Sequence, residues 1–234
     1  MAKLDIIIPV YNERATIEEL LQRVRDAAAP GFDKEIIVVD DGSTDGTGAL
    51  LDSLQDRFGL ILLRHDRNRG KGAAVRAALE RAGGDAVLIQ DADLEYDPAD
   101  YARLLAAFGP GTPVVYGSRN LGAAGQGYAL YTWGGRFLTF CLNLLFGAAL
   151  TDINTCYKLF RADIIKGLGL AADGFEFCEE ATAKTLRSGW AIKEVPVSYR
   201  PRKFAEGKKI RLRDGWRGFT TIVRQRFWKP PRRS

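Results

Sequence analysis

Residues 4–13 read LDIIIPVYNE, residues 36–45 read IIVVDDGSTD, and residues 86–93 read AVLIQDAD. Each stretch contains an apolar run, interrupted in the first only by Asp5 near its start, and ends in carboxylate or amide side chains. A run that is apolar at almost every position is typical of a strand buried on both faces, as in a parallel sheet. Because the ligands of such sheets bind beyond the carboxyl ends of the strands, we expect these three polar ends to line one site.

The rest of the first half alternates between strand and helix patterns. Two more β-branched runs, at 60–64 and 114–117, predict strands. Apolar residues at helical spacing predict the helices that separate the strands, at 17–24, 50–54, 74–78 and 101–108. Together they predict an α/β fold, a Rossmann-like and mostly parallel sheet with helices on both faces.

The second half is less regular. Residues 119–131 are rich in Gly and Ala and are expected to form a mobile loop, and residues 191–199 a strand. The apolar run 137–150 is shorter than the roughly 20 residues that span a bilayer, so we expect a buried helix or one lying in a membrane surface. Further helices are predicted at 175–188 and 215–227.

The composition indicates one catalytic domain. A chain of 234 residues can bury a full core without disulfides. Cys141, Cys156 and Cys178 form no CxxC pair and are expected to be structural thiols in a reducing compartment. The start MAKLDIIIPVYNE lacks the pattern of a cleaved signal peptide, so export by that route is not expected.

The net charge of +5 is unevenly distributed. From residue 200 onward, 13 Lys and Arg face two acidic residues, a net charge of +11, and the rest of the chain carries −6. Such a basic tail indicates nucleic acid, anionic lipid or a phosphorylated substrate as its partner. The alternative is a solvated charged surface.

Asp91 and Asp93 are the most informative pair. Two carboxylates one residue apart, directly after a buried strand, can share a hard divalent cation such as Mg²⁺ or Mn²⁺. That cation would neutralise a diphosphate leaving group. The alternative for Asp93 is a cap on the helix that begins near Pro98.

The ends of the first two predicted strands suit a nucleotide. Tyr11 offers a ring for a nucleobase, and Asp41 could accept hydrogen bonds from base or ribose. Residues 40–45, DDGSTD, also fit a turn followed by a helix N-cap. Residues 69–73, RGKGA, could offer main-chain amides and the Lys71 side chain to a phosphate, and a simple helix start explains the same letters.

The segments PVYNE, VVDDGSTDGT, NRGKGAAV, QDADLEYDP and YGSRN, in this order and spacing, resemble the family 2 glycosyltransferases of GT-A fold. The similarity is greatest to the branch of dolichol- and polyprenyl-phosphate mannose or glucose synthases, and it continues more loosely through TDINTCYKLF and EVPVSYRPRKFAEGKK. The resemblance implies an inverting hexosyltransferase that uses a divalent metal.

Three sets of site residues are expected. By position, the resemblance itself implies Pro9, Tyr11, Glu13, Val39 and Asp41 for the nucleotide, Asp91 and Asp93 for metal and diphosphate, and Arg119, Arg136 and Arg202 for the acceptor; the residues themselves add the others. Metal and diphosphate would be held by Asp91 and Asp93, with Glu95 standing where relatives often have Gln. The acceptor phosphate would be bound by Arg119, Arg136 and Arg202, which with Asp93 would carry catalysis, and Lys208 adds a further cation. The donor nucleotide would contact Pro9, Val10, Tyr11, Asn12, Glu13, Val39, Asp40, Asp41, Lys71, Asp91 and Ala92.

Elementary chemistry favours the same acceptor. Transfer to a hydroxyl needs a general base, yet the sole histidine, His65, is expected to be ordinary surface. A phosphate monoester, with a second pKa of about 6, is already a dianion at pH 7 and needs cations instead; the guanidinium fork suits its oxygens. Glu179 and Glu180 keep open the alternative of a hydroxyl acceptor, because either could serve as base.

The C-terminal region indicates a membrane surface. Trp216, Phe219, Val223 and Phe227 recur at about helical spacing among basic residues, as in an interfacial amphipathic helix. A core-packing helix with basic flanks is the alternative. Since no spanning segment is expected, the prediction is a protein that is peripheral on the cytoplasmic face, where nucleotide sugars are available.

The sequence is thus divided into a nucleotide-sugar-binding half, 1–118, an acceptor-binding half of the same domain, 119–212, and an amphipathic helix with a basic tail, 213–234. The predicted activity is transfer of a sugar from a donor of the GDP-mannose or UDP-glucose type to a polyprenyl phosphate. Within the class, the alternative acceptor is a hydroxyl of a glycan or glycolipid.

Two alternatives lie outside that class. A sugar nucleotidyltransferase would carry a Gly-rich phosphate loop where residues 11–13 read YNE. Nucleic-acid binding by the basic tail is weakly indicated, because few aromatic residues are interleaved there, and no nucleic-acid partner is expected.

Overall fold

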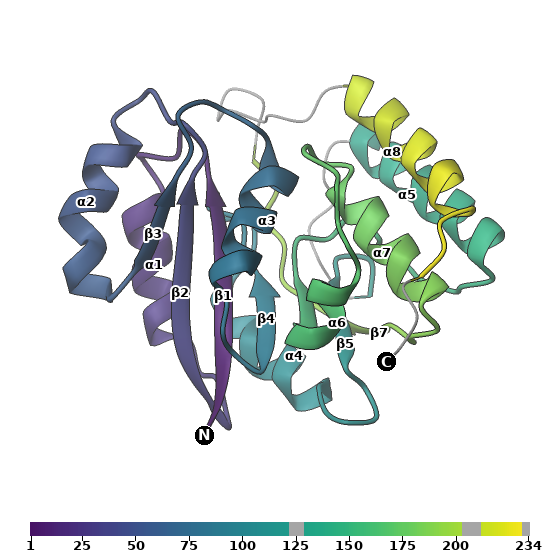
Figure 1. Ribbon diagram of the computed structural model, residues 1–234, viewed down its shortest axis with the longest axis horizontal. Helices are drawn as coiled ribbons and strands as arrows, with labels where there is room; N and C mark the ends of the chain where they lie inside the picture. The colour runs from purple at the N-terminus through teal and green to yellow at the C-terminus, as the bar shows by residue number, and fades with distance from the viewer. Residues whose placement is uncertain (122–128, 203–211, 231–234) are drawn as a thin grey trace.

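The computed structural model describes residues 1–121, 129–202 and 212–230 (Figure 1). Strands and helices alternate through the first half as the sequence predicts. The elements are β1 (Ala2–Val10), α1 (Ile17–Asp26), β2 (Phe32–Asp40), α2 (Thr47–Phe58), β3 (Ile61–Arg64), α3 (Lys71–Arg81), β4 (Ala86–Ile89), η1 (Pro98–Asp100), α4 (Tyr101–Ala107), β5 (Val114–Ser118), α5 (Ala129–Phe146), β6 (Lys158–Arg161), α6 (Ala162–Gly167), α7 (Phe177–Arg187), β7 (Lys193–Pro196) and α8 (Leu212–Gln225).

The strands form a single seven-stranded sheet in the order β3-β2-β1-β4-β6-β5-β7. β1 pairs in parallel with β2 and β4, and β5 pairs in parallel with β7. β6 is antiparallel to both β4 and β5. The predicted α/β class with a mostly parallel sheet is therefore confirmed, and β6 is an antiparallel strand that the sequence pattern did not predict.

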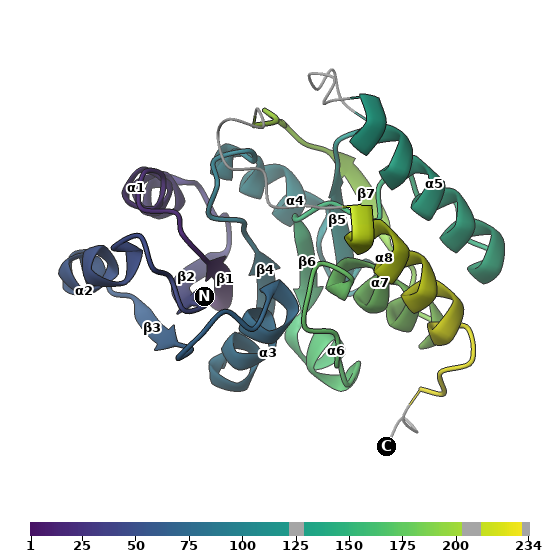
Figure 2. The same ribbon diagram turned by 90° about the horizontal axis from the view of Figure 1, so that it is seen from above.

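Helices cover both faces of the sheet. Viewed from above, α1, α2 and α4 lie on one side of the strands, and α3, α6 and α7 lie on the other (Figure 2). The buried residues of α1 are Ile17, Leu20, Leu21 and Val24, the i, i+3, i+4, i+7 stripe that a sheet-covering helix needs. The strand β4 is buried at all four positions, as expected of a sheet with two covered faces.

A second, smaller apolar core lies between α5, α7 and α8. Leu138 and Leu142 of α5 meet Ala183 of α7 and Ile222 of α8 there. The predicted apolar helix at 137–150 is observed but begins earlier, at Ala129, and the predicted helix at 215–227 corresponds to α8. Of the loop expected at 119–131, residues 122–128 lie outside the described part of the chain.

Both α5 and α8 bury one face and expose the other. On α8, Ile222 is fully buried, whereas Trp216 is 68% exposed, and Phe227, two residues after the helix, is 79% exposed. The sequence predicted either a core-packing helix or an interfacial helix with an exposed apolar face. α8 has both properties, because one face packs in the core and the other exposes apolar side chains. No helix within the described ranges is long and apolar enough to cross a membrane.

Candidate active site

The carboxyl ends of β1 and β2 lie side by side because Val10 is paired with Asp40 in the sheet. The Asn12 N–H donates to Ser43 Oγ at 2.9 Å, and the Thr44 N–H donates to Asn12 Oδ1 at 2.8 Å. Asp40 accepts the Ser43 N–H at 3.0 Å, which closes the turn that residues 40–45 predicted. The loops after the first two strands therefore form one rim.

Asp41 connects β2 to the start of α3. Its carboxylate accepts the N–H groups of Arg69 and Gly70 at 2.9 and 2.8 Å and lies 2.6 Å from His65 Nδ1. The His65 side chain is only 8% exposed, so the expectation that it is ordinary surface is wrong. It is held there because β3 pairs with β2 and ends beside Asp41. A contact of Asp41 with the nucleotide stays a prediction.

Four main-chain N–H groups at and just before the start of α3 donate hydrogen bonds within the protein. Besides the two that Asp41 accepts, the Gly72 N–H donates to Gly174 O at 3.2 Å and the Ala73 N–H to Asp173 O at 3.1 Å. These contacts favour a helix start over an amide cradle for phosphate. The Lys71 side chain, in contrast, points to the site, with Nζ 2.6 Å from Asp91 Oδ1. Burial lowers the pKa of Lys71, but Asp91 and the neighbouring thiols Cys156 and Cys178 together raise it well above its usual value.

Asp91 and Asp93 follow β4, and each side chain is 25% exposed. Asp93 Oδ1 accepts the Glu95 N–H at 3.1 Å across Leu94, which has a positive φ of 60°. Leu94 and Asn12 are the two non-glycine residues with positive φ in the described chain, and both lie at this rim, where backbone strain is concentrated. Asp97, and not Asp93, accepts the Ala99 N–H at the start of η1, so the capping alternative for Asp93 is wrong.

The two carboxylates fit a hard divalent cation. Their oxygens are the donors that Mg²⁺ and Mn²⁺ prefer, and both side chains reach the surface. Within the described residues, no three His, Cys, Asp or Glu side chains are grouped so that they could hold a metal ion. The role of Glu95 as a third metal ligand stays a prediction.

Arg202 lies between the ends of β1 and β4. Its guanidinium is 2.8 Å from Glu13 Oε2 and 3.7 Å from Asp93 Oδ2, and Nε donates to Asp93 O at 2.9 Å. Glu95 holds the backbone of this segment, accepting the Arg202 N–H and the Tyr199 hydroxyl, both at 2.8 Å. A residue from the predicted acceptor half thus reaches the Asp91–Asp93 pair.

Arg119 lies next to the same cluster. Its guanidinium donates from Nε and Nη2 to both oxygens of Asp152, at 2.7 and 2.8 Å, and stacks 5.0 Å from the centre of the Tyr199 ring. Burial raises the pKa of Asp152, but Arg119 outweighs it, and the pKa is lowered. Tyr199 therefore connects Arg119 to Glu95 and Arg202. Asp152 and Tyr199 were not singled out from the sequence, although both lie in the quoted segments TDINTCYKLF and EVPVSYRPRKFAEGKK.

The remaining predicted residues are placed less directly. Arg136 is exposed on α5 and makes no hydrogen bond or ion pair within the described chain, and Lys208 lies outside it. Val10, Val39 and Ala92 are at most 4% exposed, so a nucleotide could meet them only through the main chain.

The two candidate bases on α7 have different surroundings. Glu180 is fully buried, and its carboxylate accepts the N–H groups of Ala171 and Ala172 and pairs with Lys184 at 2.8 Å, which makes it unsuitable as a base. Glu179 accepts the Asn154 amide at 2.6 Å through Oε1, and burial raises its pKa to about 7. Its Oε2 is buried without a hydrogen-bond partner among the described residues.

The seven-stranded, mostly parallel sheet has the GT-A fold, which it shares with the solved glycosyltransferase structures described below. Residues 5–169 match the family model described as Glycosyl transferase family 2, and the chain belongs to this family. The resemblance inferred from the motifs is thereby confirmed.

Three curated relatives show the branch of the family. The chain is 31% identical over 217 residues to an undecaprenyl-phosphate 4-deoxy-4-formamido-L-arabinose transferase of Pseudomonas fluorescens, covering 90% of this chain and 61% of that protein. It is 31% identical to a polyprenol monophosphomannose synthase of Mycolicibacterium smegmatis, covering 87% and 79%. It is 30% identical to a dolichol-phosphate mannosyltransferase of Pyrococcus furiosus, covering 88% and 59%. The chain therefore spans about three fifths of the length of the first and third relatives.

Solved structures share the fold. The glucosyl-3-phosphoglycerate synthase of Mycobacterium tuberculosis, crystallised with UDP, has a TM-score of 0.75 at 20% identity and covers 96% of this chain and 80% of its own. The same enzyme has been crystallised with Mn²⁺, UDP and glucosyl-3-phosphoglycerate, with a TM-score of 0.73 at 22% identity, covering 98% and 81%.

Proposed function

We propose that this protein transfers a sugar, with inversion, from a nucleoside-diphosphate sugar of the GDP-mannose or UDP-glucose type to a polyprenyl or dolichyl phosphate. The observation that carries the proposal is the cluster at Tyr199. Arg119 stacks on the Tyr199 ring, and Glu95 accepts both the Tyr199 hydroxyl and the Arg202 N–H. The Arg202 guanidinium in turn lies 3.7 Å from the partly exposed Asp93. Cations for an anionic acceptor and carboxylates for the donor side thus lie at one rim. The three curated relatives carry names of lipid-phosphate sugar transferases, which supports the same acceptor.

The donor half is proposed to be residues 1–118. The nucleotide would lie along the rim formed by residues 11–13 and 40–41. Asp91 and Asp93 would hold Mg²⁺ or Mn²⁺, which when bound supplies positive charge to the departing diphosphate. Lys71, fixed 2.6 Å from Asp91, adds a permanent positive charge at the same place.

The acceptor half is proposed to be residues 119–212. An ionised phosphate oxygen attacks the anomeric carbon and needs no proton removed, so arginines suffice to bind and orient it. Asp152 uses two of the five N–H donors of Arg119 and leaves others for phosphate oxygens. Arg136 and Lys208 would add charge at the approach to the site.

A hydroxyl acceptor is the second candidate, favoured by the environment of Glu179. A buried carboxyl group whose pKa is raised to about 7 is suited to act as a general base near neutrality. Glu179→Gln separates the two. A hydroxyl acceptor predicts loss of transfer, whereas a phosphate acceptor predicts transfer close to wild type.

The acceptor lipid requires a membrane surface, and we propose that the outer faces of α5 and α8 provide the contact. Residues 133, 137, 140 and 144 of α5 follow one stripe, and their side chains, Trp133, Phe137, Phe140 and Leu144, are 57–74% exposed. The ring of Phe137 stacks on Phe219 of α8, 6.3 Å away, which makes the two stripes continuous. Exposed arginines on and just after α8, at 213, 217, 224 and 226, suit the anionic cytoplasmic leaflet.

The proposed function is tested by nucleoside diphosphate release from UDP- and GDP-sugars with Mn²⁺ or Mg²⁺, with and without a short polyprenyl phosphate. Release that requires the lipid phosphate is expected. Release that is indifferent to the lipid phosphate and requires a glycan hydroxyl would support the second candidate. No release with any donor would refute the enzyme assignment.

A further inference from the structure

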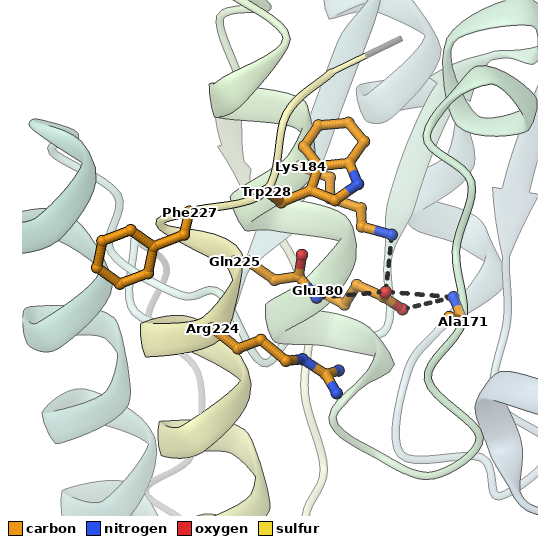
Figure 3. A pocket seen from close by; sticks show the side chains of 7 residues that line it. All are labelled: Ala171, Glu180, Lys184, Arg224, Gln225, Phe227 and Trp228. Carbon is orange, nitrogen blue, oxygen red and sulfur yellow. Dashed lines mark hydrogen bonds and ion pairs between the residues drawn. The ribbon is translucent and has the colours of Figure 1, made fainter.

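A chain of contacts runs from the end of α8 to the start of α3, next to Asp91. It begins at a hollow of about 350 Å³ where α7 and α8 face the loop at Ala171 (Figure 3). Glu180 of α7 lies at its floor, with no exposed surface. Its carboxylate accepts the Ala171 N–H at 3.0 Å and the Ala172 N–H at 2.7 Å, and pairs with Lys184 at 2.8 Å.

The end of α8 is attached to this carboxylate and its partner. Gln225 Nε2 lies 3.5 Å from Glu180 Oε1, and the Lys184 ammonium lies 5.1 Å from the centre of the Trp228 ring. Arg187 Nε also donates to Trp228 O at 3.2 Å. A buried carboxylate is costly unless its oxygens have hydrogen-bond or ion-pair partners. Moving the end of α8 away from α7 would remove one of the partners of Glu180, so these contacts favour one arrangement of the two helices.

The loop that Glu180 holds supports the start of α3. Asp173 O and Gly174 O accept the N–H groups of Ala73 and Gly72, at 3.1 and 3.2 Å. A Cβ at Gly72 would overlap the Ala172 carbonyl, so helix and loop touch backbone to backbone. Lys71 stands in this helix turn, and its ammonium reaches Asp91.

We propose that Glu180 is a positioning residue for donor binding, through which the end of α8 holds the start of α3 and keeps Lys71 at Asp91. The inference rests on the proposed function, because it assigns this contact chain to the nucleotide site. Glu180 itself touches neither donor nor acceptor. Loosening it moves the loop at 171–174, and with it the cation beside the diphosphate position.

The test compares Glu180→Gln with Glu194→Gln. Glu194 makes the same kind of contact elsewhere, accepting the N–H groups of Thr151 and Asp152 at 2.7 and 2.9 Å, on the side of Arg119. Affinity for UDP and GDP in the presence of Mn²⁺ is measured by calorimetry. We expect Glu180→Gln to weaken it by about three- to tenfold, the range typical of coupling through packed contacts. Glu194→Gln should leave nucleotide affinity unchanged and raise the KM for the lipid phosphate.

The measurement separates positioning from stability. A purely structural role would reduce the fraction of competent protein, and so the binding stoichiometry, while leaving the Kd unchanged. Gln225→Met changes the α8 side of the same contact and should also raise the Kd for the nucleotide, by a smaller factor. It replaces Glu180→Gln in the test if that variant fails to fold. Wild-type affinity in both variants would overturn the inference; absence of nucleotide binding by the wild-type protein would instead overturn the proposed function.

Discussion

Replacing Arg202 by Met tests the proposed acceptor site most directly. The guanidinium is 15% exposed and lies 3.7 Å from Asp93 and 2.8 Å from Glu13. A single negative charge at the Asp93 distance is attracted by about 4 kcal/mol at an effective dielectric constant of about 20. Glu13 already neutralises part of the cation, so we assign about 2–3 kcal/mol to an acceptor phosphate, equivalent to a loss of about 30- to 150-fold in affinity.

The assay is the rate of nucleoside diphosphate release as a function of lipid phosphate concentration at saturating donor. At saturating donor, Arg202→Met should lower kcat/KM for the lipid phosphate by that factor. Arg103→Met is the matched control, because Arg103 pairs with Asp100 at 2.8 Å but is 52% exposed on α4. A kcat/KM for Arg202→Met close to that of Arg103→Met, in proteins with equal thermal stability, would refute the reasoning.

Three other predictions follow from the site and the helix faces. Asp152→Asn should lower the free energy of unfolding by about 3 kcal/mol at pH 7, because it breaks a buried ion pair. Since Arg119 lowers the pKa of Asp152 in the folded state, this difference should persist above about pH 4 and vanish as the pH falls through the lowered pKa. Equal stability of the two proteins in urea unfolding at pH 7 would contradict the prediction. Asp91→Asn should remove most of the Mn²⁺ dependence of nucleotide binding, and calorimetry that finds the same dependence as in wild type would count against metal binding there. Phe137→Ser combined with Phe227→Ser should lower binding to vesicles with anionic lipid by about tenfold. Nucleoside diphosphate release with a short lipid phosphate in detergent should stay unchanged. Undiminished vesicle binding, or salt-sensitive binding to RNA alone, would exclude the outer faces of α5 and α8 as the membrane contact.

The part of the fold that sequence could predict is the part built from local patterns. β4 is apolar at every position, and β1 and β2 contain the apolar runs 6–10 and 36–39. Ile17, Leu20, Leu21 and Val24 mark α1 by spacing alone. β6 escaped prediction because its four residues, KLFR, include a lysine and an arginine. Lys158 is nevertheless fully buried, and its ammonium donates to Ile153 O at 2.8 Å and lies 3.8 Å from the centre of the Tyr116 ring. Only the folded chain supplies those partners.

The candidate site likewise has residues that local sequence patterns predict and residues that only tertiary contacts bring together. Asp91 and Asp93 could be recognised because they directly follow a buried strand, and parallel strands bring their carboxyl ends to one edge. The pairing of Arg202 with Glu13 joins residues 189 positions apart, and that of Arg119 with Asp152 joins residues 33 apart, so neither has a local pattern. The prediction for His65 was wrong for a related reason, since the side chain is held by Asp41, which follows the neighbouring strand β2. The cations that would choose the acceptor are thus placed by tertiary contacts, whereas the carboxylates that would serve the donor are placed by the strand they follow. The motifs leave open how residues 119–234 act on the site. The Arg202 variant tests whether this half binds the acceptor phosphate directly, and the Glu180 variant tests whether it also affects donor binding from a distance.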